Sequence, residues 1–276
     1  MEQHASWLTH LVNRYLGQFA LELLSALHIT PNHREMPIPE HVVMSMVVLV
    51  LGTVLALALR SRLSADRPGG MQQVAEMLIT NPLGFGIRDL LDENAGHGGR
   101  RFIAFTGGIS VFILLANLLG VVPLFSSPTG EKSVPLGCAL LTFVYFNYQG
   151  VRHHGAVHYL LTFAGSPKKL ADWLLVILLF PVEIISTTAR VLSLTVRLWA
   201  NIFASDLIYT LFLSLLLSPV LWAQSKSIAL AVILGVFPAL IPLIFIALHI
   251  FVSVIQSYVF TVLPSIYLGM ATAEEH

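Results

Sequence analysis

Residues 182–218 read VEIISTTARVLSLTVRLWANIFASDLIYTLFLSLLLS and contain no glycine or proline, although Pro181 and Pro219 stand immediately on either side. Glycine and proline are the residues that most often interrupt a helix, so this stretch predicts one continuous helix. At 1.5 Å per residue it would be about 55 Å long, whereas the hydrocarbon core of a bilayer is about 30 Å thick. We therefore expect a membrane-crossing helix that is strongly tilted.

The composition of the whole chain agrees with a membrane protein. Hydrophobic residues make up 56% of the 276 positions and charged residues 11%, whereas a soluble domain carries about 25% charged residues. The 15 basic and 15 acidic side chains cancel, so there is no basic field for nucleic acid. The single Cys138 excludes an internal disulfide and a multi-cysteine metal site, and we expect neither a metal nor a cofactor.

Apolar runs of membrane-spanning length predict an all-α integral membrane protein with five membrane-crossing helices. The last two runs are long, and the short connection at 219–227 predicts that they form a tilted, antiparallel hairpin. No internal repeat is visible. The expected spans are about 42–60, 102–122, 134–150, 173–218 and 228–268.

The basic residues orient these spans. Six lie between Arg60 and Arg101, whereas the next connection holds only Lys132. Because basic loops face the cytoplasm, we expect the N-terminus outside and the C-terminus inside.

Two segments predict helices that lie on the membrane surface rather than cross it. Residues 1–40 lack the features of a signal peptide. Residues 1–41 are expected to form an amphipathic segment that faces outside, ahead of a membrane domain at 42–276. Residues 71–91 are too polar to cross and predict a second interfacial helix. In the first segment, apolar residues recur every three or four positions, at Leu8, Leu11, Tyr15, Phe19, Leu23 and Leu27.

Ionisable side chains inside the fourth span are the strongest functional signal. Charged residues at membrane depth are costly, so they normally face protein or water and mark ion paths. Glu183, Arg190 and Arg197 recur every seven residues and therefore share one helix face. Ser193 falls on the same face, and Asn201 continues it one turn further. The fourth lies nine residues further, on roughly the opposite face. These four residues are Glu183, Arg190, Arg197 and Asp206.

The last span carries a second polar stripe, formed by His249, Ser253 and Gln256. Antiparallel packing would bring this stripe beside Asp206 and Asn201. Histidine is the side chain that most readily exchanges a proton near neutral pH. The two helices therefore predict a wet, proton-handling cleft.

Each of these residues also has a purely structural interpretation. Arg197 could neutralise a neighbouring carboxylate or reach a headgroup, Glu183 and Arg190 could form a local ion pair, and His249 could be a satisfied core histidine. Their combination on facing helices favours one aqueous pathway.

A histidine cluster outside the spans is a weaker candidate. His153, His154 and His158 have helical spacing, but we expect them in a solvated loop beside Arg152 with no carboxylate to complete a metal site. No hydrolase motif is present.

Three stretches carry a family resemblance. PVEIISTTARVLSLTVRLWANIFASDLI at 181–208 closely resembles the signature of subunit a of F-type ATP synthases, and LHIFVSVIQSYVFTVLPSIYLGMATAEEH at 248–276 resembles the C-terminus of that family. NLLGVVP at 117–123 agrees more weakly. The resemblance extends over about 42–276.

The resemblance implies a non-catalytic stator subunit that conducts protons between two half-channels and a rotor ring of c subunits. It also implies peripheral-stalk b subunits as partners and a bacterial plasma membrane as the location. Arg197 matches the essential arginine that faces the rotor. The matching positions of the outer half-channel are Asp206, His249, Asn201 and Gln256, and those of the cytoplasmic half-channel are Glu183, Ser193 and Arg190.

The chain departs from the family pattern at three places. Asp206 stands where Glu or His is frequent, and Trp199 and Ala200 stand where Gly is frequent. SPTGEKS at 127–133 replaces a polar pattern that usually helps to line the outer entry.

Two functions from other classes compete with this interpretation. A stand-alone ion-coupled secondary transporter would bind its solute near broken helices, which the unbroken 182–218 stretch disfavours. A structural scaffold would give no reason for ionisable residues inside a span.

Overall fold

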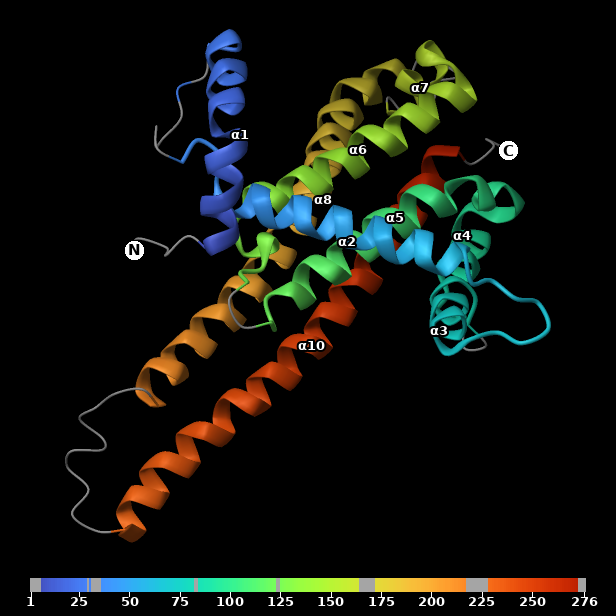
Figure 1. The fold of residues 1–276 in the computed structure, drawn as a ribbon. Coiled ribbons are helices and arrows are strands. Elements are labelled where there is room, and N and C mark those ends of the chain that lie inside the picture. The colour runs from blue at the N-terminus through green and yellow to red at the C-terminus, as the bar shows by residue number, and fades with distance from the viewer. Residues whose placement is uncertain are drawn as a thin grey trace. The chain divides into compact units, whose positions relative to one another are not determined.

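The computed structural model describes residues 6–28, 30, 36–81, 84–122, 125–163, 172–216 and 228–272. Every regular element in these ranges is a helix (Figure 1). The expected all-α class is therefore confirmed.

Four helical segments among the described residues are long and apolar enough to cross a membrane. They are Glu40–Arg60, Gly98–Leu119, Val176–Ile208 and Leu243–Thr272. The helix at the expected third span, α6 (Ser133–His154), has 22 residues but is not among the four. The chain is thus a multi-pass membrane protein, and the fifth crossing stays a prediction.

The two longest helices are α8 (Asp172–Leu216) and α10 (Ile228–Thr272), each of 45 residues (Figure 1). Pro181 lies inside α8 without ending it. The predicted continuous helix over residues 182–218 is therefore present as far as Leu216. The connection at 219–227 lies outside the described residues. The tilt and the antiparallel arrangement of the two helices remain predictions.

The N-terminal helix α1 (Trp7–Ala26) begins at an N-cap in which the Ser6 hydroxyl accepts a hydrogen bond from the Thr9 backbone N–H. The Asn13 side chain in this helix donates to the Ile38 carbonyl and accepts from the Ile38 N–H, both at 3.0 Å. These two bonds tie α1 to the residues that precede α2 (Glu40–Arg60).

The segment expected as one interfacial helix at 71–91 forms two helices, α3 (Gly70–Ile79) and α4 (Ile87–Ala95). The chain is already extended at Thr80, and Gly84 has a φ of +76°, a conformation that side chains other than glycine rarely adopt. Local backbone geometry therefore overrides the apolar periodicity that favoured a single helix.

Two compact units divide the chain. One comprises Met1–Leu55, Leu114–Glu131 and Ala200–Val254, and the other comprises Ala56–Ile113, Lys132–Trp199 and Ile255–His276. Four of the boundaries fall within helices α2, α5 (Ile103–Leu119), α8 and α10, and the one between Glu131 and Lys132 falls just before α6. Each unit thus takes a part of the same long helices.

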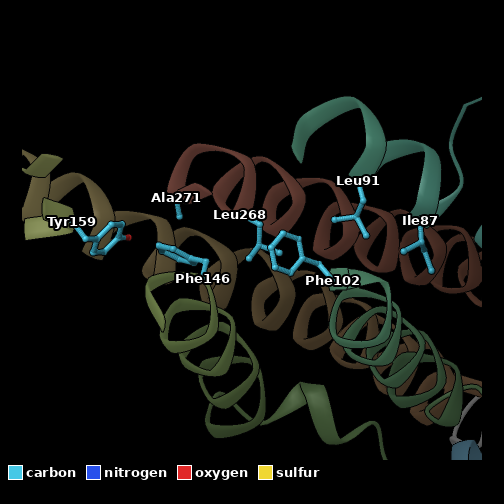
Figure 2. Close-up of a cluster of buried hydrophobic side chains, with 7 residues drawn as sticks. All are labelled: Ile87, Leu91, Phe102, Phe146, Tyr159, Leu268 and Ala271. Carbon is cyan, nitrogen blue, oxygen red and sulfur yellow. The ribbon is translucent and has the colours of Figure 1, made fainter. Parts of the chain in front are cut away.

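The second unit contains an apolar core, shown in Figure 2. Aromatic rings extend this core: the rings of Phe105 and Tyr145 stack with centroids 3.7 Å apart, and Phe102 meets Tyr145 edge to face. The core links α4, α6, α10 and the short α7 (Ala156–Phe163). Its buried members are Ile87, Leu91, Phe102, Phe146, Tyr159, Leu268 and Ala271.

Hydroxyl groups join α5 to α10 in the same unit. The buried Ser110 and Ser257 hydroxyls lie 2.8 Å apart, and the Thr261 hydroxyl donates to Ser110 Oγ at 2.8 Å. Hydrogen bonds of this kind hold helices together where lipid removes the hydrophobic driving force.

A close backbone contact generates a prediction for Gly269 in α10. A Cβ at this position would collide with the Asn94 carbonyl oxygen of α4. Because a backbone atom cannot move aside, Gly269→Ala should destabilise the protein by about 1–3 kcal/mol. Thermal unfolding of the purified protein in detergent measures the effect.

Gly137 in α6 is the matched control, because a Cβ there meets no atom within 4 Å. Gly137→Ala should leave the melting temperature unchanged or raise it, since alanine favours a helix over glycine by about 1 kcal/mol. Equal melting temperatures for both variants would contradict the described packing of α10 on α4.

Candidate functional site

The first unit holds a small polar cavity at His249. The histidine is buried, and its Nε2 lies 3.0 Å from the Asn117 carbonyl oxygen of α5. Asp206 of α8 and His249 of α10 line the same cavity of about 20 Å³, which has room for a water molecule. The structure thus brings Asp206 and His249 to one cavity, and their part in proton transfer stays a prediction.

A polar segment between α5 and α6 completes this site. The Thr129 hydroxyl donates to Asn117 Oδ1, and the Ser127 hydroxyl donates to the Ala116 carbonyl at 3.0 Å. All of these side chains are buried, and Asn117 Nδ2 has no hydrogen-bond partner among the described residues. Asn117 thus touches the histidine through its backbone and leaves a side-chain donor for a further partner.

Gly130 ends this segment beside the carboxylate. A Cβ at Gly130 would lie 3.2 Å from Asp206 Oδ2, so the absence of a side chain lets the backbone approach Asp206 closely. Sequence reasoning missed Asn117, Thr129 and Gly130 as site residues. Asn117 falls in NLLGVVP, which agrees only weakly with the family pattern, and Thr129 and Gly130 fall in SPTGEKS, which departs from it.

The α10 stripe is buried, as a polar face toward protein requires. The Ser253 hydroxyl donates back to the His249 carbonyl at 2.7 Å. Gln256 is only 2% exposed, and its Oε1 accepts no hydrogen bond among the described residues. An unsatisfied buried amide in a membrane helix favours a water or proton partner over a purely structural role.

The polar face of α8 differs from the buried polar stripe of α10 in its exposure to the surface. Three of its residues are exposed: Ser193, Arg197 and Asn201. Within the described ranges, Arg197 forms no ion pair. Asn201 does not line the cavity shared by Asp206 and His249, although antiparallel packing is expected to bring it beside the polar stripe of α10. The guanidinium is thus a charge on an apolar helix that the described chain does not neutralise.

Glu183 and Arg190 form a second polar site in the other unit. Arg190 Nη2 lies 3.7 Å from Glu183 Oε1, and its guanidinium stands 5.1 Å from the centroid of the Tyr267 ring. Both ions are partly exposed, so the pair itself contributes little to stability. Both line a cavity of about 150 Å³, large enough for several waters.

Tyr159 lies at the wall of this cavity. Its hydroxyl donates to Asn147 Oδ1 at 3.1 Å, and burial raises the pKa of the Tyr159 phenol. The phenol therefore remains a neutral hydrogen-bond donor at physiological pH.

The three histidines expected in a loop lie in helices. His153 and His154 belong to the last turn of α6, where their rings stack 4.8 Å apart, and His158 belongs to α7. Gly155, with a φ of +81°, makes the sharp turn between the two helices. In the part of the chain that the structure describes, no group of three or more His, Cys, Asp or Glu residues could hold a metal ion.

Comparisons with known proteins give one consistent family. A model of the family described as "ATP synthase A chain" matches residues 41–269. The ATP synthase subunit a of Koribacter versatilis is 37% identical over 99% of both chains, and that of Solibacter usitatus is 37% identical over 96% of this chain and all of the relative. ATP synthase subunit a 1 of Syntrophotalea carbinolica is 32% identical over 86% of this chain and 87% of the relative.

The matches cover the polar positions of α8 and α10 together with the apolar helices that carry them. With a family model across most of its length and relatives that align from end to end, the chain belongs to the ATP synthase A chain family.

Proposed function

We propose that this chain is the membrane-embedded stator subunit of a rotary ATP synthase and conducts protons through two offset half-channels to and from the carboxylates of the rotor ring. The observation that carries the proposal is Arg197, an exposed guanidinium on a membrane helix with no ion pair in the described chain. A partner must supply the negative charge, because an unneutralised cation in lipid is costly.

Arg197 lies between two separate polar sites of the same helix. In the sequence of α8, Arg190 and Asp206 lie on opposite sides of Arg197. Each end has its own cavity, one lined by Glu183 and Arg190 and one by Asp206 and His249. This separation supports two half-channels that do not meet directly.

In the outer half-channel, Asp206 and His249 exchange protons with water, and Asn201 and Gln256 continue the path to the rotor. Asp206 and His249 are the titratable pair of their cavity. Gln256 Oε1, which accepts no hydrogen bond among the described residues, supplies a free hydrogen-bond acceptor at membrane depth.

In the cytoplasmic half-channel, Glu183, Arg190 and Ser193 lead protons away from the rotor. The Glu183–Arg190 pair is loose at 3.7 Å and lines a cavity large enough for water, which suits a hydrated path better than a structural clamp.

The chemistry of Arg197 keeps the two paths separate. A guanidinium does not release its proton under physiological conditions, so it cannot relay one. Its charge stabilises the ionised form of an approaching carboxylate and thereby drives release of the proton that the carboxylate carried. Protons must therefore cross between the half-channels on the rotor.

This function implies a ring of carboxylate-bearing c subunits, peripheral-stalk b subunits and a location in the bacterial plasma membrane, with the N-terminus outside. The chain itself would catalyse no chemical step. A stand-alone secondary transporter is the competing function. The continuity of α8 disfavours it, since solute sites of such transporters usually lie at broken helices.

Replacing Arg197 by alanine should abolish ATP-driven proton pumping in vesicles while the complex still assembles, because no fixed cation would then discharge the rotor carboxylate. Acidification measured with a pH-sensitive dye, together with subunit composition, reports the two effects. The control is Arg62→Ala, at an exposed arginine after α2. Normal pumping by the Arg197→Ala complex would refute the mechanism.

Asp206→Asn and His249→Ala should each slow proton pumping by roughly tenfold or more, since each removes a proton-exchanging group. Ser214→Ala, at an exposed position of the same helix as Asp206, should pump normally. If all three variants pump at equal rates, the outer path does not run through this cavity.

A further inference from the structure

The second unit also contains a basic cavity whose residues take no part in the proposed proton path. Arg101, Gln149, Arg152 and His153 line this cavity, which has a volume of about 440 Å³. No carboxylate is among its lining residues in the described part of the chain. Two arginines that converge on one space without an acid repel each other, unless an anion from outside the chain lies between them.

Neither arginine is neutralised elsewhere in the described ranges. Of the neighbouring basic residues, Arg88 and Arg100 share Asp92, at 3.7 and 3.9 Å, whereas Arg101 and Arg152 form no ion pair with the residues that the structure describes. Arg101 instead lies 4.6 Å above the centroid of the Phe102 ring. Stacking on a ring leaves the N–H groups at the edge of a guanidinium available, and their geometry suits a phosphate.

The cavity lies at an end of the membrane helices. Arg101 stands at the start of the Gly98–Leu119 span, and Arg152 stands in the last turn of α6. The contact of Phe102 and Phe105 with Tyr145 places the start of α5 beside the C-terminal half of α6. Aromatic residues next to cations at the end of a span are typical of the headgroup region of a bilayer.

An exposed apolar stripe on α6 leads directly to the cavity. Leu141, Val144 and Tyr148 are 57%, 61% and 57% exposed, and their spacing places them on one helix face. Arg152 follows Tyr148 one turn later. A ligand on this surface would thus meet an apolar face and then two cations, which is the order of groups in a phospholipid.

We propose that Arg101 and Arg152 bind the phosphate of an anionic phospholipid, with Gln149 and His153 as additional hydrogen-bond donors and the lipid's acyl chains along the α6 stripe. Basic pockets between membrane helices bind anionic headgroups in this way. The apolar stripe favours a lipid over free phosphate, because a free anion would gain nothing from it. This site is separate from the proposed proton path and does not depend on it.

The test is native mass spectrometry of the purified chain, with phosphatidylglycerol or phosphatidylcholine added at increasing concentrations. The wild-type chain should retain one phosphatidylglycerol in preference to phosphatidylcholine. The double variant R101Q/R152Q should bind it roughly thirtyfold more weakly, since each cation near a membrane surface contributes roughly a factor of five. R62Q, which removes an exposed arginine elsewhere, should bind as the wild type does.

A charge-conserving variant and a folding control accompany this test. R101K/R152K keeps both charges and should bind within about fivefold of the wild type, while circular dichroism verifies that all variants remain helical. Wild-type affinity in a helical R101Q/R152Q chain would overturn the proposal.

Displacement of the lipid by millimolar inorganic phosphate would also overturn it, in favour of a free anion. Loss of the lipid on assembly of the complete synthase would overturn it in favour of a contact with another subunit.

Discussion

A positive charge held on a helix that crosses lipid is the constraint on which the rest of this protein depends. Arg197 is exposed on α8 and has no ion pair in the described chain. A charge at membrane depth costs at least about 2.5 kcal/mol, so the site requires an acidic partner or water beside it.

The backbone obeys a related constraint. In lipid every N–H and C=O must be paired within the protein, which explains why the ionisable residues sit on uninterrupted helices rather than on loops. The segment at 125–132, which contains the short 3₁₀ helix Pro128–Gly130, is held to α5 by side-chain hydrogen bonds. Ser127 and Thr129 are buried there and bond to the Ala116 carbonyl and to Asn117 Oδ1. Gly130, at the end of this 3₁₀ helix, brings the backbone close to Asp206.

The two charged sites on α8 differ in physical character. Asp206 and His249 line a small cavity of about 20 Å³, and His249 is buried. Glu183 and Arg190 line a wider cavity and are partly exposed, so water screens them. The two sites on α8 therefore differ in the space around their ionisable groups, with Arg197 between them in sequence.

The sequence by itself determined the helical class, the membrane location, the length of α8 and the polar stripe on α10, because these depend on local periodicity and on hydrophobicity. The family signature in α8 also identified the candidate residues. Only the tertiary structure decided that the Asn117 backbone meets His249, that Gly130 approaches Asp206 and that Arg101 and Arg152 share a cavity. The reason is physical: these contacts join residues far apart in the chain, and their geometry is set by helix packing, which no local pattern encodes.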